Sequence, residues 1–299
     1  MFELTILTKP PVNQEMRMKF ILIATFVLAI SAQAQTEVID TAQFVAVYDY
    51  KCRTQNDEGT PVTDKMQVVV QVGRLLTKSM PFSAYSRTEE LEETDIVASY
   101  QEALMHMPTV WIELPSGYTT VREFIFPREY DSTEETPEIK WVLSEDTMTV
   151  CGYFCQKATA MFRGVEWNVY YTEEIPSSAG PWRLSGLPGL IVEAKNEAHI
   201  FRLAELRQET STITTPEQNP DVQRVKYEKL MKYRNEIYGN SKYAGNPLYY
   251  IAEFQNGTIS LGGTINHMEV MNFGGKQYIY ADGHPLLTKA HVYQPLEDK

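Results

Sequence analysis

The sequence has few cysteines, scattered histidines and no excess of basic residues, and each shortage excludes a class of protein. Three Cys do not make a disulfide-dense scaffold, and neither their spacing nor that of the five His matches a zinc site, so no metal is expected. A formal net charge of −12 excludes a chain-wide basic surface for nucleic acid. The 43% hydrophobic and 22% charged composition is typical of a globular protein of one or two domains.

Recognised catalytic motifs are also missing. There is no G-x-S-x-G elbow, no H-E-x-x-H, no Walker A and no G-x-G-x-x-G, so we expect no catalytic residue and no cofactor. Glu197 and His199 would lie on one face of a strand, the geometry of an acid/base pair. A salt link on a hairpin rim is the more ordinary explanation. A hydrolase built from Glu174, Glu197 and His199 is the alternative function.

Long apolar runs are missing except for one near the N-terminus. Two basic residues precede an apolar run over 20–30, and an Ala-x-Ala cleavage site ends at Ala34. A run of 11 residues is too short to span about 30 Å of hydrocarbon, whereas this order of segments is typical of a secretory signal peptide. We expect residues 1–34 to be removed on export, with residues 1–15 upstream of the true start.

The remaining chain, residues 35–299, is expected to be one exported domain of the periplasm or cell envelope. No second apolar stretch approaches spanning length, so no transmembrane segment is expected after signal removal. No Cys stands at the cleavage point, so no lipid anchor is expected. A Thr- and Pro-rich stretch marks a candidate subdivision near 210–220.

The cysteines fall in the exported part, where disulfides can form. If residues 151–155 are extended, Cys151 and Cys155 lie about 13 Å apart, beyond the roughly 7 Å that a bridge spans. A turn at Gly152 would relax this limit. Cys52 with one of the other two is the better candidate for a disulfide, and the third thiol is expected to be a small buried hydrophobe.

Short β-branched and aromatic segments separated by turn residues dominate the exported part. Strands are expected at 44–52 and 66–72. Four hairpins are expected, with turns at 115–117, 163–164, 195–197 and 274–275. This pattern predicts an α+β fold, mainly antiparallel β, in which one or two helices pack on a curved sheet or partly open barrel.

Two segments carry helix signals. A capping box at Ser86 precedes apolar residues at helical spacing that continue to Pro108. Asn219-Pro220 is an N-cap followed by Pro at the first helical position, and Gly239 would close that second helix.

Residues 151–194 combine turn residues with aromatic side chains. Three prolines within thirteen positions, Pro176, Pro181 and Pro188, stiffen the connection, and Pro188-Gly189 suits a type II turn. The stiff loop could form a binding lip for an apolar or stacked ligand, or its aromatics could pack as core. The ligand-binding candidates are Arg163, Trp167, Tyr170, Tyr171 and Trp182.

This stretch resembles the GLPGLI family of exported Bacteroidetes proteins, named after the hexapeptide that stands here at 186–191. Val165, Val169-Tyr170 and Ala179 depart from the family pattern but leave its turn residues intact. The shared blocks are Gly152-Tyr153-x-Cys155-x-Lys157-Ala158, Phe162-Arg163-Gly164, Ile175-Pro176 and Gly180-Pro181-Trp182. The motif residues expected to shape the structure are Cys155, Gly164, Pro176, Gly180, Pro181, Gly186, Leu187, Pro188, Gly189, Leu190 and Ile191.

The resemblance implies an exported protein and carries no catalytic residues, because the family is one of unknown function. With no nucleophile arrangement present, we expect a non-catalytic binding or envelope-assembly module. Its partner would be an apolar or peptide-like ligand or another envelope protein.

Overall fold

The computed structural model describes residues 39–56, 59–86, 107–125, 128–216, 220, 222–238, 267–273, 276–282 and 292–298. The chain divides into two compact units, Met1–Val38 and Ile39–Lys299, and the second carries every described residue. The expected signal peptide and the expected helix before Pro108 lie outside the described residues. No helix in the described ranges has the length and apolar character needed to cross a membrane.

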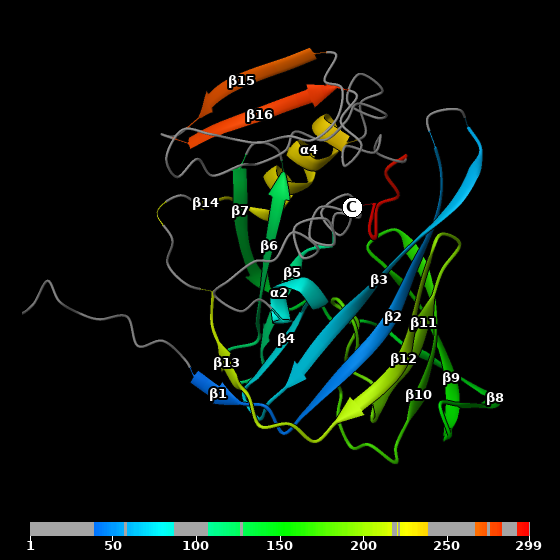
Figure 1. The fold of residues 1–299 in the computed structure, drawn as a ribbon. Coiled ribbons are helices and arrows are strands. Elements are labelled where there is room, and N and C mark those ends of the chain that lie inside the picture. The colour runs from blue at the N-terminus through cyan, green and yellow to red at the C-terminus, as the bar shows by residue number, and fades with distance from the viewer. Residues whose placement is uncertain are drawn as a thin grey trace, which may run out of the picture. The chain divides into compact units, whose positions relative to one another are not determined.

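Twelve strands form one curved sheet (Figure 1). In spatial order they are β14 (Gln223–Arg224), β7 (Arg128–Glu135), β6 (Tyr118–Ile125), β5 (Thr109–Glu113), β4 (Leu76–Pro81), β3 (Pro61–Val72), β2 (Phe44–Gln55), β12 (His199–Arg207), β11 (Leu190–Lys195), β10 (Val165–Thr172), β9 (Tyr153–Phe162) and β8 (Val142–Val150). All neighbouring pairs are antiparallel except β14 with β7.

Four further strands and two helices complete the described structure. β1 (Ile39–Thr41) pairs with β13 (Thr212–Thr214), and β15 (His267–Phe273) pairs with β16 (Lys276–Asp282). The helices are α2 (Phe82–Ser86) and α4 (Tyr227–Tyr238). The predicted α+β class with a mainly antiparallel sheet is confirmed, and the sheet is curved rather than closed into a barrel.

All four expected hairpins are present, joining β5 to β6, β9 to β10, β11 to β12 and β15 to β16. The β9–β10 turn has only two residues, Arg163 and Gly164, with φ of 47° and 82°. Positive φ at both central positions is what a type I′ turn requires, and that turn matches the twist of paired strands. Cys151 and Gly152 form a similar turn between β8 and β9, with φ of 52° and 86°.

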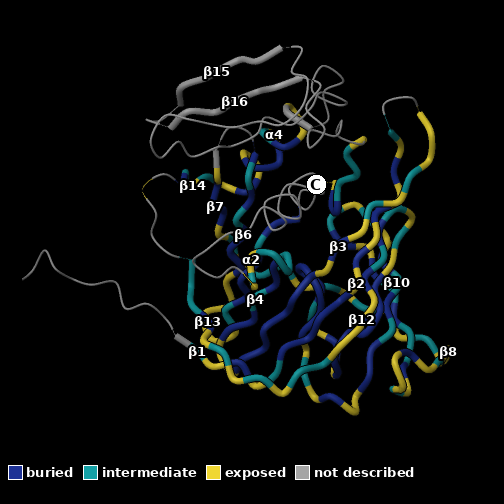
Figure 2. Tube along the Cα trace, viewed as in Figure 1, coloured by how far each residue is buried: buried dark blue, intermediate teal, exposed yellow. Residues whose placement is uncertain are grey.

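The middle of the sheet is buried on both faces. Alternate residues of β2 enter two different apolar clusters, because successive side chains of a strand point to opposite faces. Tyr48 and Tyr50 lie in the larger cluster, whereas Val45 and Val47 lie in a smaller one beside α2. Figure 2 shows the buried residues of β2 and β3 in dark blue.

The second expected helix begins later than its sequence signal indicated. Instead of starting at Pro220, α4 starts at Tyr227, and Gln223–Arg224 form the short strand β14. The backbone N–H of Val225 then donates to the carbonyl of Asp131 on β7, at 2.9 Å. Pairing with β7 satisfies the backbone hydrogen bonds of residues 223–225 outside a helix. This contact with β7 outweighs the local helix signal of Asn219-Pro220.

The expected disulfide is wrong, since Cys52, Cys151 and Cys155 are all free. Three strands, β12, β11 and β10, separate Cys52 on β2 from Cys155 on β9. Four strand spacings of about 4.8 Å place them roughly 19 Å apart along the sheet, far beyond the reach of a bridge.

One thiol of the folded protein is expected to react quickly with a chromogenic disulfide reagent, and all three after unfolding. Cys151 is exposed, whereas Cys52 and Cys155 are buried. Burial raises the pKa of Cys52 to about 11 and also raises that of Cys155, which keeps both as unreactive thiols. Thiol titration with and without denaturant measures this, and recovery of a single thiol in denaturant would reveal a disulfide.

Candidate functional site

Three of the aromatic residues expected to form a binding lip lie in the core. Trp167, Tyr171 and Trp182 are each at most 1% exposed. The Trp167 and Trp182 ring centroids lie 5.8 Å apart, and Phe201 lies 6.1 Å from Trp167. These three candidates therefore offer no surface to a ligand. Tyr170 is partly buried and lies 5.9 Å from the Lys195 ammonium.

The GLPGLI segment is held by close backbone packing. A Cβ on Gly189 would lie 2.1 Å from the carbonyl oxygen of Thr172, so no larger residue fits there without moving β10. Gly180 is similarly enclosed, with the Leu184 carbonyl oxygen 2.6 Å from the Cβ position. The expected type II turn is wrong, because it needs positive φ at Gly189 and the positive φ of 94° is at Gly186.

Arg163, the remaining ligand-binding candidate, belongs to an alternating ring of charges. Its Nη2 lies 2.7 Å from both carboxylate oxygens of Glu134 on β7, and Arg183 also binds Glu134. A second carboxylate, Glu297, lies 3.2 Å from Nη1 of Arg183 and 3.7 Å from Nε of Arg163. The ring joins the β9–β10 turn to β7, which stands near the opposite end of the strand order.

Helix α4 extends this ring through Arg234. Its Nη1 lies 3.1 Å from Oε1 of Glu297, and its Nε lies 3.0 Å from both carboxylate oxygens of Glu123 on β6. Burial alone would lower the pKa of Arg234, but the Glu123 carboxylate raises it well above its ordinary value. The guanidinium therefore stays charged. We call these six residues the ion cluster: Glu123, Glu134, Arg163, Arg183, Arg234 and Glu297.

Glu297 reaches the ion cluster from residues 292–298, which we call the strap. The strap has no regular secondary structure. It contacts the Gln55 end of β2, the His199 end of β12 and the β9–β10 turn at Arg163. The N–H of Val292 donates to the carbonyl of Gln55 at 2.8 Å, and the N–H of Asp298 donates to that of Arg163 at 2.9 Å. Glu297 is 1% exposed, although Asp298 beside it is exposed.

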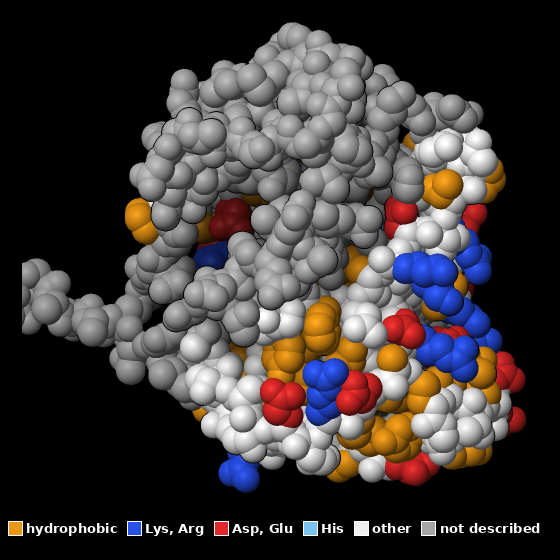
Figure 3. Space-filling model, in the orientation of Figure 1, with side chains coloured by type: hydrophobic (Ala, Val, Ile, Leu, Met, Phe, Trp, Pro, Cys, Tyr) orange, Lys and Arg blue, Asp and Glu red, His pale blue; other side chains and the backbone are white. Residues whose placement is uncertain are grey.

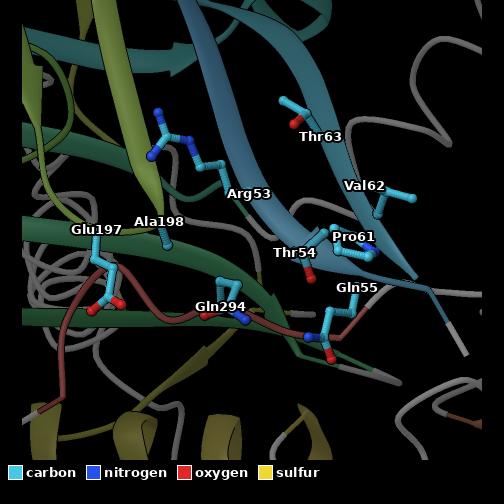
Figure 4. Close-up of a pocket in the computed structure, with 9 residues that line it drawn as sticks. All are labelled: Arg53, Thr54, Gln55, Pro61, Val62, Thr63, Glu197, Ala198 and Gln294. Atoms are coloured by element: carbon cyan, nitrogen blue, oxygen red, sulfur yellow. The ribbon is translucent and has the colours of Figure 1, made fainter. Parts of the chain in front are cut away.

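Two adjoining hollows lie beside the strap, of about 590 and 750 Å³. Both are lined by Arg53, Glu197, Ala198 and Gln294. Figure 4 shows Gln294 of the strap between Glu197 on one side and Gln55 on the other. The larger hollow adds polar side chains from the starts of β10 and the β11–β12 turn, namely Glu166, Asn168, Lys195 and Asn196. We call the strap and these hollows together the strap groove.

The structure does not assemble the alternative hydrolase site. Glu174 follows the Thr172 end of β10, which pairs with Leu190, whereas Glu197 follows Lys195 at the other end of β11. The two carboxylates thus flank opposite ends of one strand pair. Glu174 accepts the N–H of Phe154 at 2.9 Å, and Glu197 is exposed at the hollow.

His199 has a structural role. Its Nδ1 lies 2.8 Å from the Tyr50 hydroxyl, and its Nε2 lies 3.1 Å from the Pro295 carbonyl oxygen of the strap. A carbonyl oxygen only accepts, so Nε2 donates and Nδ1 accepts from Tyr50. Burial lowers the pKa of His199 to about 4. Both nitrogens are engaged, which leaves neither for proton transfer to a substrate.

The His199 contacts predict a dependence of stability on pH. The folded-state pKa of about 4 is below the ordinary 6.5, so between these values the unfolded chain binds a proton that the folded chain does not. This contribution is present above pH 6.5 and is lost on acidification toward pH 4, by on the order of 3 kcal/mol.

Urea unfolding at several pH values, compared between the wild type and His199→Phe, measures this contribution. The His199 ring stacks on Tyr50 and Trp167, and phenylalanine keeps this stacking but cannot titrate. The free energy of unfolding of the wild type minus that of the variant should therefore decrease as pH falls from 6.5 to 4. Parallel pH profiles would contradict the structural role of a neutral His199.

The described residues also bear on metal binding. Within the described ranges, no group of three or more His, Cys, Asp or Glu side chains is arranged to hold a metal ion. The polar side chains that line the strap groove are basic, acidic and amide side chains. Such a set is suited to hydrogen bonding.

Comparisons with known proteins give little functional information. Residues 162–193 match a family described as "Protein of unknown function (Porph_ging)". No curated protein matches the chain. Structures of PNGF-II in the P21 and C2 space groups are similar, with 12% and 13% identity and TM-scores of 0.44 and 0.42. Each comparison covers 79% of this chain, which spans only 39% of the length of those structures.

Sequence reasoning missed most residues of the strap groove. Arg53 and Gln294 belong to no motif and lie far apart in the sequence, and Lys195 was noted only as part of the expected turn at 195–197. Arg183 directly follows the Gly-Pro-Trp block, so its position beside a shared motif was a usable signal. Glu297 carried none, because an acidic residue in an acidic sequence is unremarkable until its neighbours are known.

Proposed function

We propose that the protein is a GLPGLI-type protein of the periplasm or cell envelope that binds a peptide-like ligand in the strap groove without catalysis. The observation that carries the proposal is the strap itself. A peptide segment already lies there, bound through backbone N–H and carbonyl groups, with about 590 and 750 Å³ of open space beside it. Grooves of that volume are typical of ligand sites.

The lining of the groove favours a peptide-like ligand over a wholly apolar one. Arg53 and Lys195 supply cations, Glu197 supplies a carboxylate, and Asn168 and Asn196 can both donate and accept hydrogen bonds. Figure 3 shows acidic and basic side chains side by side on the described part of one face.

Peptide selection from a random library displayed on phage tests the binding proposal. The exported chain should retain peptides whose affinity falls at least tenfold in a variant carrying Arg53→Glu and Lys195→Glu. A matched control with the same charge change, Lys65→Glu with Lys232→Glu, alters exposed residues outside both hollows and should change affinity less than twofold. Failure to select any peptide, or equal loss in both variants, would overturn the proposal.

The location is tested separately by fractionating host cells and sequencing the N-terminus of the protein. The basic, apolar and small-residue segments support export, with Gln35 as the first residue of the product. Recovery from the cytoplasm with residues 20–30 still attached would contradict it.

A further inference from the structure

The ion cluster balances its charge only with a residue supplied by the strap. Three arginines, Arg163, Arg183 and Arg234, face three carboxylates, and Glu297 is the carboxylate that contacts all three arginines. Glu123 and Glu134 come instead from neighbouring strands of the sheet. Without Glu297 the cluster would retain three buried or half-buried cations and two carboxylates. Such an excess charge is unfavourable in a buried site unless another anion replaces the missing one.

An aromatic ring shapes this subsite as well. The guanidinium groups of Arg163 and Arg183 lie 4.0 and 5.0 Å from the centroid of the Tyr227 ring. Stacking on an aromatic face limits the orientations of both guanidinium groups, and planar guanidinium groups are well suited to binding carboxylates. The subsite is thus already arranged for one carboxylate.

The rest of the strap joins no sheet. Its backbone bonds reach Gln55, Arg163, His199 and the Thr54 hydroxyl, and open hollows adjoin it. Val292 is 40% exposed, whereas Leu296 and Glu297 are buried. The strap therefore contacts the protein as a short bound peptide does, with the apolar anchors Tyr293 and Leu296 and the acidic anchor Glu297.

We infer that the strap groove recognises acidic peptide segments, and that the strap occupies the site in cis, with Glu297 in the place of the ligand carboxylate. This inference rests on the proposed function and specifies its ligand class. An incoming segment with an apolar residue followed by Glu displaces the strap and restores the charge balance of the ion cluster. Recognition is then a competition between two chemically similar segments for one site.

A fluorescent peptide copying residues 292–298 tests the competition by anisotropy in the full chain. The Glu297→Gln chain, whose own strap lacks the carboxylate, should bind this peptide at least tenfold more tightly than the wild type does. A peptide with Gln in place of its Glu should bind the Glu297→Gln chain at least tenfold more weakly. Asp298→Asn alters the exposed neighbour and should behave as the wild type.

Hydrogen exchange of the unaltered chain keeps the test decisive if Glu297→Gln does not fold. Excess Glu peptide should accelerate exchange at the N–H groups of Val292 and Asp298, while the Gln peptide should not. Equal binding of both peptides, or unchanged strap exchange at millimolar Glu peptide, would overturn the inference. A library peptide that requires Arg53 and Lys195 but leaves the strap in place would overturn it while the proposed function stands.

Discussion

Replacing Glu297 by alanine is expected to lower the free energy of unfolding by about 3–5 kcal/mol, the range for removing one partner from a buried ion pair. The size follows from burial, because Glu297 is 1% exposed and its carboxylate contacts Arg163, Arg183 and Arg234. Loss of the carboxylate leaves these guanidinium groups with one counter-ion fewer. Urea unfolding at pH 7 measures the change.

Asp298→Ala is the matched control for that substitution. Asp298 is the next residue of the strap, carries the same charge and is exposed. Its Cβ, which packs near Gly164, is retained in alanine, so the expected change is within about 0.5 kcal/mol. Equal losses of unfolding free energy in the two variants would show that the effect comes from the change in net charge and not from the contacts of Glu297 in the ion cluster.

Gly189→Ala is expected to destabilise the protein by about 3 kcal/mol or more, the upper part of the range for overpacking. The new methyl group would lie 2.1 Å from the Thr172 carbonyl oxygen, which is backbone and cannot rotate away. Relief requires β10 and β11 to separate where Thr172 pairs with Leu190. Thermal or urea unfolding measures the loss.

Gly117→Ala separates steric overlap from the general effect of losing a glycine. Gly117 has φ of 69° and no atom within 4 Å of its Cβ position, so only the left-handed backbone is penalised, by about 1–2 kcal/mol. If Gly189→Ala were as mild as this control, the close approach of the GLPGLI segment to β10 would not matter for stability.

The sheet was predictable because its signals are local. The Arg163-Gly164 turn and the flanking apolar alternation specify a hairpin within a dozen residues, and the same holds for the β5–β6 turn at Gly117. The start of α4 was not predictable, because it depends on Val225 bonding to Asp131, almost a hundred residues earlier. The absence of a disulfide depends on the strand order, which places β12, β11 and β10 between Cys52 and Cys155.

The candidate site was less predictable than the fold. Sequence reasoning correctly singled out Trp167 and Trp182 as unusual but could not separate core packing from ligand contact, because both need large aromatic side chains. It also selected Arg163, whose partner Glu297 lies 134 positions away and was invisible from spacing. Partners that the chain brings together only by folding leave no periodic signal.

Photo-crosslinking with a library-selected peptide most directly tests the claim that the strap groove is the ligand site. The peptide carries a benzophenone group, and mass spectrometry maps the attachment points on residues 35–299. The account predicts crosslinks within residues 53–55, 166–168, 195–200 or 292–298, reduced by the Arg53→Glu and Lys195→Glu substitutions. Crosslinks confined to the β5–β6 hairpin or to α4, and unaffected by those substitutions, would contradict it.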